Sequence, residues 1–172
     1  MCEHCQKIMN KIWPKLQIGR QYRTPDLYKG KDFCIEEKSS LKIKIKPQNI
    51  SITKESFWAA LHYLIQNEHN FKNQCEIRSS NSRIAAGPLC LASRDKNSNV
   101  RCINYILPIL QKFQIVGIDP VRPNKTWLIW KIWKKAQPAA EEGRANPLRS
   151  FASLLTATIP LNTLKSTKHC LL

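Results

Sequence analysis

Two cysteines near the start of the sequence have the spacing of half a zinc site. Cys2 and Cys5 lie in the segment CEHC, and two thiolates at this spacing can bind one zinc ion from a tight turn. A structural zinc site needs four ligands, and the sequence has neither a second CxxC nor an HxxxH pattern. Further ligands would have to be brought together by the fold from Cys34, His62, His69 and Cys75. We therefore expect no metal or cofactor, and the alternative is a half-site completed elsewhere in the chain or across a dimer.

A second group of residues matches the letters of the PD-(D/E)xK nuclease motif. Pro25-Asp26 is followed, after nine residues, by Glu36-Glu37-Lys38. The resemblance implies that Asp26 and Glu36 would hold Mg²⁺ and that Lys38 would polarise water beside a phosphate. The middle letter is usually apolar in this family, the spacing here is short, and no long helix with a preceding glutamate is visible. A solvated turn explains the segment at least as well, so we expect a noncatalytic protein, with a Mg²⁺-dependent nuclease as the alternative.

The charge of the chain indicates a polyanionic partner. Lysines and arginines number 28 against 12 acidic residues, which gives a net charge of +16. Residues 78–135 carry eleven basic and two acidic side chains. Nucleic acid is the commonest polyanion for a basic protein, and an anionic membrane surface is the other candidate. No run of residues approaches the ~18 apolar residues of a membrane span, and the N-terminus has no apolar signal core. Seven cysteines without framework spacing fit a reducing cytosol, so we expect a cytoplasmic protein, associated with the nucleoid if it binds DNA.

Residues 97–131 must position any nucleic-acid contacts, because they have the pattern of a helix followed by a hairpin. Ser98 is expected to cap the helix, and apolar residues then recur every three to four positions up to Phe113. Pro108 should kink this helix. The other face carries Asn99, Arg101, Asn104, Tyr105 and Lys112. Strands are expected at 115–118 and 125–131, joined by a basic turn.

This helix and hairpin resemble, at superfamily level, the recognition helix and wing of a winged-helix (helix-turn-helix) DNA-binding domain. The resemblance covers residues 53–131 and depends on element order more than on a motif. It implies that the major groove would be faced by Ser98, Asn99, Arg101, Asn104 and Tyr105. It implies backbone or minor-groove contacts from Arg122, Asn124 and Lys125, and we add Arg83 and Lys96 to the DNA-binding set. The alternative is an ordinary helix and hairpin in an α+β core.

The whole chain is expected to be α+β, with a winged-helix-like three-helix core preceded by a small antiparallel sheet. Thr53 should cap the first core helix, a short strand is expected at 75–78, and a second helix at 88–94. In LKIKIK, isoleucines alternate with lysines, which indicates a strand with either an anionic group near its lysines or an exposed edge position. The expected segments are an N-terminal segment (1–18), a β-subdomain (19–52), a winged-helix-like domain (53–135) and a mostly disordered tail (136–172).

Our leading functional hypothesis is a small DNA-binding protein, such as a regulator or an accessory protein of restriction or mobile elements. Asn104 and Arg101 have the geometry to read adenine and guanine edges in the major groove. The alternatives are the nuclease and a noncatalytic RNA-binding or protein-interaction module. The sequence gives no target site and no oligomeric state, and a dimer stays open.

Overall fold

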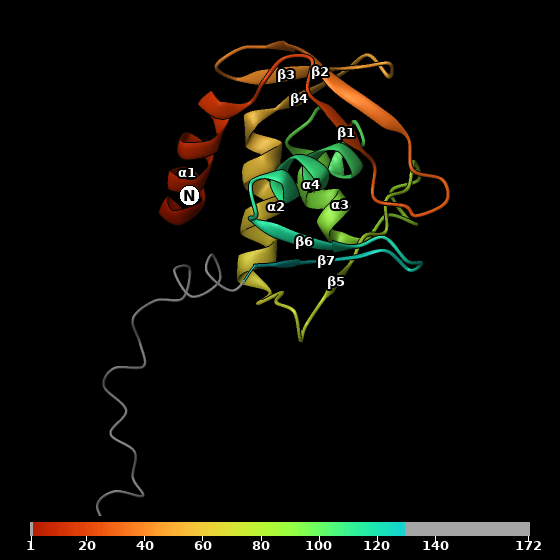
Figure 1. The fold of residues 1–172 in the computed structure, drawn as a ribbon. Coiled ribbons are helices and arrows are strands. Elements are labelled where there is room, and N and C mark those ends of the chain that lie inside the picture. The colour runs from red at the N-terminus through yellow and green to blue at the C-terminus, as the bar shows by residue number, and fades with distance from the viewer. Residues whose placement is uncertain (1, 130–172) are drawn as a thin grey trace, which may run out of the picture. The chain divides into compact units, whose positions relative to one another are not determined.

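Residues 2–129 form a mixed α+β structure in the computed structural model, which describes this part of the chain (Figure 1). The helices are α1 (Glu3–Ile12), the 3-10 turn η1 (Trp13–Lys15), α2 (Lys54–Gln66), α3 (Pro88–Asp95) and α4 (Ile103–Lys112). The strands are β1 (Gln21–Arg23), β2 (Asp32–Lys38), β3 (Lys42–Lys46), β4 (Ile50–Thr53), β5 (Cys75–Glu76), β6 (Val116–Asp119) and β7 (Lys125–Leu128). The expected α+β class is confirmed. The expected tail, and the last residues of the expected hairpin, lie outside the described residues.

The strands form two antiparallel sheets. Four strands pair in the order β1-β2-β3-β4, and three pair in the order β5-β7-β6. The alternation in LKIKIK does produce a half-buried strand, since Ile43 and Ile45 of β3 are fully buried. β3 lies inside its sheet, so the edge-strand interpretation of its lysines is wrong.

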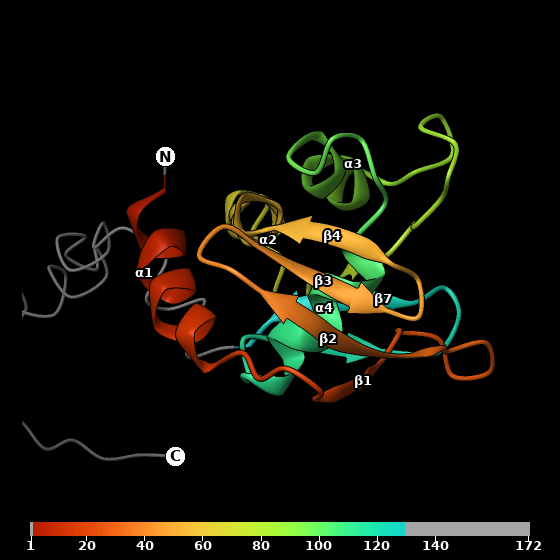
Figure 2. The same ribbon diagram turned by 90° about the horizontal axis from the view of Figure 1, so that it is seen from above.

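Helices α2 and α4 lie between the two sheets, α3 packs against α2, and α1 flanks α2 (Figure 1). Seen from above, the four-stranded sheet covers α4 (Figure 2). Phe33 of β2 packs edge-on against Tyr105 of α4, with 5.1 Å between ring centroids. Isoleucines of β2, β3 and β4 and apolar residues of all the helices belong to one hydrophobic core. The segment 19–52 therefore shares its core with the helices of the next segment.

Helix α2 forms where the sequence predicts it. The Thr53 hydroxyl accepts a hydrogen bond from the Ser56 N–H, which satisfies a backbone donor at the helix start. Phe57, Leu61 and Leu64 recur at helical spacing and are fully buried. Helix α3 also agrees with the expectation and has a proline at its first position, where no hydrogen-bond donor is needed.

Helix α4 begins later than expected, so the prediction that Ser98 caps it is wrong. Ser98 and Asn99 have positive φ angles of 50° and 60°, which a right-handed helix does not allow. Cys102 occupies the cap position, and α4 starts at Ile103. The residues from Lys96 to Arg101 form a turn between α3 and α4.

No helix of the described residues is long and apolar enough to cross a membrane.

Candidate nucleic-acid interface and thiol–imidazole cluster

The turn between α3 and α4 brings together several residues of the expected DNA-binding set. Lys96, Ser98 and Asn99 are exposed, and Arg101 is half-buried at the end of the turn. The Arg83 guanidinium donates to the Asn99 side-chain oxygen at 2.7 Å and to an Asp95 carboxylate oxygen at 2.9 Å. We call this set the turn cluster: Arg83, Lys96, Ser98, Asn99 and Arg101. It lies on loops, whereas the sequence placed Ser98, Asn99 and Arg101 on a helix.

Arg94 is a buried cation that binds the turn, and no pattern in the sequence indicated this role. Its side chain is 5% exposed. Nη1 donates to the carbonyl oxygens of Ser80 and Asn81, and Nε donates to that of Asn99. Arg94 therefore joins the 79–82 loop to the α3–α4 turn. The sequence indicated only its position in the last turn of a predicted helix.

Asn97 is a buried amide that holds the other side of the same turn. It is 4% exposed, its Oδ1 accepts from the Thr53 N–H at 3.0 Å, and its Nδ2 donates to the Ser51 carbonyl at 3.1 Å. The Thr53 hydroxyl donates to the Lys96 carbonyl at 2.6 Å. These bonds join the turn to the start of α2, so its exposed side chains project from a rigid backbone. Nothing in the sequence pattern marks this long-range role.

The outer face of α4 is covered, so the prediction that Tyr105 faces a DNA groove is wrong. Tyr105 is 9% exposed and contacts Phe33. Burial raises the pKa of the Tyr105 phenol, and the positive charge of Arg101 opposes this shift. Asn104 is half-buried on the same helix. The four-stranded sheet packs over this part of α4 (Figure 2).

The hairpin cation Arg122 is bound to another part of the chain. Its Nη2 lies 2.7 Å from the Asp26 carboxylate in the β1–β2 loop, and its Nε donates to the same oxygen. Hydrogen bonds from the Lys29 N–H and from Arg122 lower the pKa of Asp26. Asn124 donates to the Pro120 carbonyl, and Lys125 lies opposite Asp119 in the β6–β7 pair. The side chains of Arg122 and Asn124 therefore have intramolecular partners.

The candidate nuclease residues each have separate partners. Glu36 binds Lys44 and Lys46 of β3, and the Lys38 ammonium donates to the carbonyls of Pro14 and Leu16. Asp26 is bound by Arg122, as described above. Within residues 2–129, neither carboxylate belongs to a group of metal-ligating side chains. The geometry gives the nuclease interpretation no support.

A thiol–imidazole cluster forms where α1 meets α2. The potential ligand atoms of Cys2, Cys5 and His62 all lie within 4.8 Å of one another. Cys2 precedes α1, Cys5 lies in its first turn, and His62 comes from α2. The fold thus adds one of the expected candidate ligands to the CxxC pair, while no such group within the described residues includes Cys34, His69 or Cys75.

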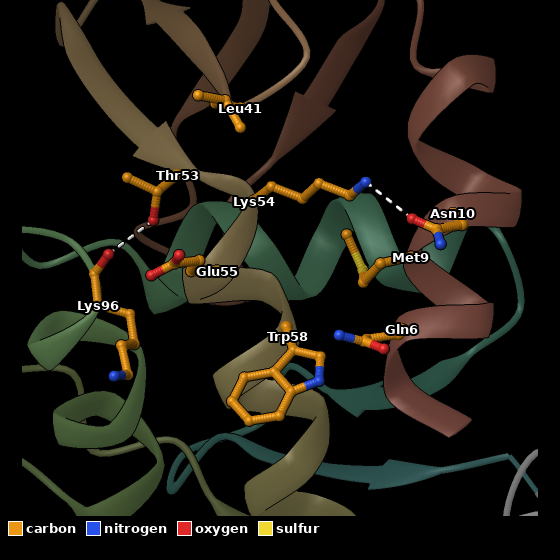
Figure 3. Close-up of a pocket in the computed structure, with 9 residues that line it drawn as sticks. All are labelled: Gln6, Met9, Asn10, Leu41, Thr53, Lys54, Glu55, Trp58 and Lys96. Atoms are coloured by element: carbon orange, nitrogen blue, oxygen red, sulfur yellow. Dashed lines mark hydrogen bonds between the residues drawn. The ribbon is translucent and has the colours of Figure 1, made fainter. Parts of the chain in front are cut away.

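A groove of about 660 Å³ separates α1 from the start of α2 (Figure 3). Lys54 crosses one side of it and donates to the Asn10 side chain at 2.9 Å. Lys96 of the turn cluster lies at the opposite side, so the groove continues the cationic surface of the turn. Its lining is completed by Gln6, Met9, Leu41, Thr53, Glu55 and Trp58.

Comparisons of this chain with protein-family models, with curated proteins and with solved structures find no match.

Proposed function

We propose that the chain binds nucleic acid, with duplex DNA as the first candidate, through the turn cluster and not through the outer face of α4. The observation that carries this proposal is the exposed, cationic turn held in place by two buried polar residues, Arg94 and Asn97. A rigid cationic turn loses little conformational freedom when it contacts phosphate groups.

The order of elements supports a relationship to winged-helix architecture. The sequence of α2, β5, α3, α4, β6 and β7, with strand order β5-β7-β6, is the order of that architecture. The covered outer face of α4 departs from it. Contacts from the turn would reach phosphates more readily than base edges, so we propose salt-dependent binding with modest sequence preference.

The ion pairs of the described residues separate cations that are already bound to a carboxylate from cations that are not. Lys44, Lys46 and Arg122 are bound to carboxylates of the same chain. Lys96 and Arg101 have no carboxylate within 4.0 Å among the residues that the structure describes, whereas Arg83 of the turn cluster is bound to Asp95. The charges of Lys96 and Arg101 are therefore available to an external anion.

Binding of a labelled duplex, followed by fluorescence anisotropy, tests this proposal. We expect the double variant Lys96→Ala/Arg101→Ala to bind roughly ten- to thirty-fold more weakly near 0.15 M salt, because each lost phosphate contact removes ~0.9 from the salt slope. The plot of log K against log salt should become shallower by about two. The control is Lys72→Ala/Lys112→Ala, which removes equal charge from exposed positions elsewhere.

Equal weakening by both pairs would show that only the total charge matters and would reject the turn as the site. No binding by the intact chain at low salt would reject the function.

Competition with single-stranded RNA tests the duplex preference. The preference is rejected if the RNA displaces the labelled duplex at a lower concentration than unlabelled duplex does.

A further inference from the structure

We infer that Cys2, Cys5 and His62 form a zinc-binding site that joins α1 to α2. This inference is independent of nucleic-acid binding, because none of the three ligands belongs to the turn cluster and the two proposals are tested by different measurements.

The potential ligand atoms of the three side chains are already nearly as close together as in a zinc site. In tetrahedral zinc coordination the ligand atoms lie ~3.5–3.8 Å apart, given Zn–S and Zn–N bonds of about 2.3 and 2.1 Å. The ligand atoms here lie within 4.8 Å of one another, so small side-chain adjustments suffice. Two thiols and one imidazole are ligands typical of zinc in proteins.

Trp58 orients two of the three ligands. Its indole N–H donates to the Cys2 carbonyl at 3.4 Å. Its ring stacks on the His62 imidazole with 5.0 Å between centroids and 13° between planes. Trp58 lies one helical turn before His62, so a single side chain holds both the backbone of Cys2 and the ring of His62.

The environment leaves polar groups that a cation would satisfy. His62 Nδ1 is buried and has no hydrogen-bond partner among the described residues. Cys5 is fully buried at the same contact between α1 and α2. A buried imidazole nitrogen without a partner therefore belongs to a side chain that lies beside two thiols. Zinc would accept the nitrogen lone pair and stabilise the thiolate.

The site would have three protein ligands and one open position. Cys2 is half-buried, so water can complete the tetrahedron from the solvent side. Binding of Zn²⁺ by the two thiols and the imidazole releases two protons, one from each sulfur. Because the ligands come from two helices, the bound metal would stabilise the packing of α1 on α2.

Metal content and cobalt substitution of the full chain, kept under reductant, test this site. We expect one zinc per chain after addition of Zn²⁺ and removal of excess, and a thiolate-to-metal charge-transfer absorption after addition of Co²⁺. Cys2→Ser and His62→Gln should each weaken zinc binding at least a hundredfold. Cys34→Ser and His69→Gln are matched controls, because these residues lie outside the cluster and should leave binding unchanged.

The Tm of the wild-type protein gives a second test, which does not depend on whether a variant folds. A chelator should lower the Tm of the zinc-loaded wild-type protein and leave the Tm of Cys2→Ser unchanged. The inference is overturned if the folded, reduced wild-type chain retains no zinc. It is also overturned if the cluster and control variants bind equally, or if the purified chain carries a Cys2–Cys5 disulfide and takes up no metal after reduction.

Discussion

Arg94 and Asn97 show how single buried polar residues determine the shape of an exposed surface. Each makes several hydrogen bonds to backbone groups on different segments. A buried donor set of this kind is costly unless every donor has a partner, so the surrounding carbonyls are constrained to one arrangement. The turn cluster above them takes its geometry from these two side chains.

The substitution Arg94→Met tests that dependence. Methionine keeps the apolar stem but removes the donors to three backbone carbonyls. We expect the free energy of unfolding to fall by about 2–4 kcal/mol, because buried acceptors lose charge-assisted partners. Urea denaturation followed by circular dichroism measures the change. Arg20→Met, at an arginine whose side chain donates only to exposed Gln17 among the described residues, should stay within about 0.5 kcal/mol of wild type, and an equal loss in both variants would contradict the role given to Arg94.

Residue-level prediction from sequence succeeded where the interaction is local. Thr53 was recognisable as a cap because its partner, the Ser56 N–H, is three residues away. Ser98 has the same chemistry but does not cap, because Asn97 binds Ser51 and Thr53 more than forty residues earlier in the chain and holds the backbone in a turn. Hydrogen bonds between residues so far apart produce no periodic pattern in the sequence.

At the scale of elements, the β2–β3 pair uses opposite charges to place cationic strand residues side by side. Lys44 binds Glu36 and Glu37, and Lys46 binds Glu36 at 2.6 Å. The anionic group that the lysines of LKIKIK required is therefore in the neighbouring strand. The carboxylates of Glu36 and Glu37 reduce the repulsion between Lys44 and Lys46.

The stability of the protein should depend on pH through the ion pairs between β2 and β3. Hydrogen bonds from Lys46 and then Lys44 hold the pKa of Glu36 below its ordinary value of 4.5. A carboxylate with a lowered pKa in the folded state contributes stability above its ordinary pKa and loses it as the pH falls through the folded value. Glu36→Gln should therefore lower the Tm at pH 7, and the difference from wild type should shrink as the pH falls below 4.5 and through the lowered pKa of Glu36. Thermal denaturation across this range, with Glu68→Gln as the exposed control, measures it, and a difference that persists in acid would rule out a charge effect.

Helix α4 shows why a correctly predicted element can be assigned the wrong exposure. The spacing of Ile103, Ile106 and Leu110 predicted the helix, and these residues are fully buried as expected. Tyr105 was placed on the polar side, yet it packs against Phe33, which is 72 positions earlier. The spacing of apolar residues predicts one buried face of a helix. Burial of the opposite face of α4 depends on packing against a sheet that is distant in the sequence, so local spacing does not predict it.

At the scale of the molecule, the two sheets and the helices between them share one core, and Phe33 is the residue that tests this. It is 1% exposed and stacks on Tyr22 as well as contacting Tyr105 edge-on. Truncation to alanine removes aromatic contacts with both the sheet and α4. We expect Phe33→Ala to lower the free energy of unfolding by about 3–5 kcal/mol.

The number of unfolding transitions distinguishes one shared core from two independent cores. With one core, circular dichroism and tryptophan fluorescence of Phe33→Ala should report a single, coincident urea transition at lower concentration than in wild type. An independent 19–52 subdomain would instead give two transitions, with only the first shifted, which would contradict the shared core. Tyr28→Ala is the control, because this aromatic in the β1–β2 loop is 83% exposed and its loss should change the stability by no more than about 0.5 kcal/mol.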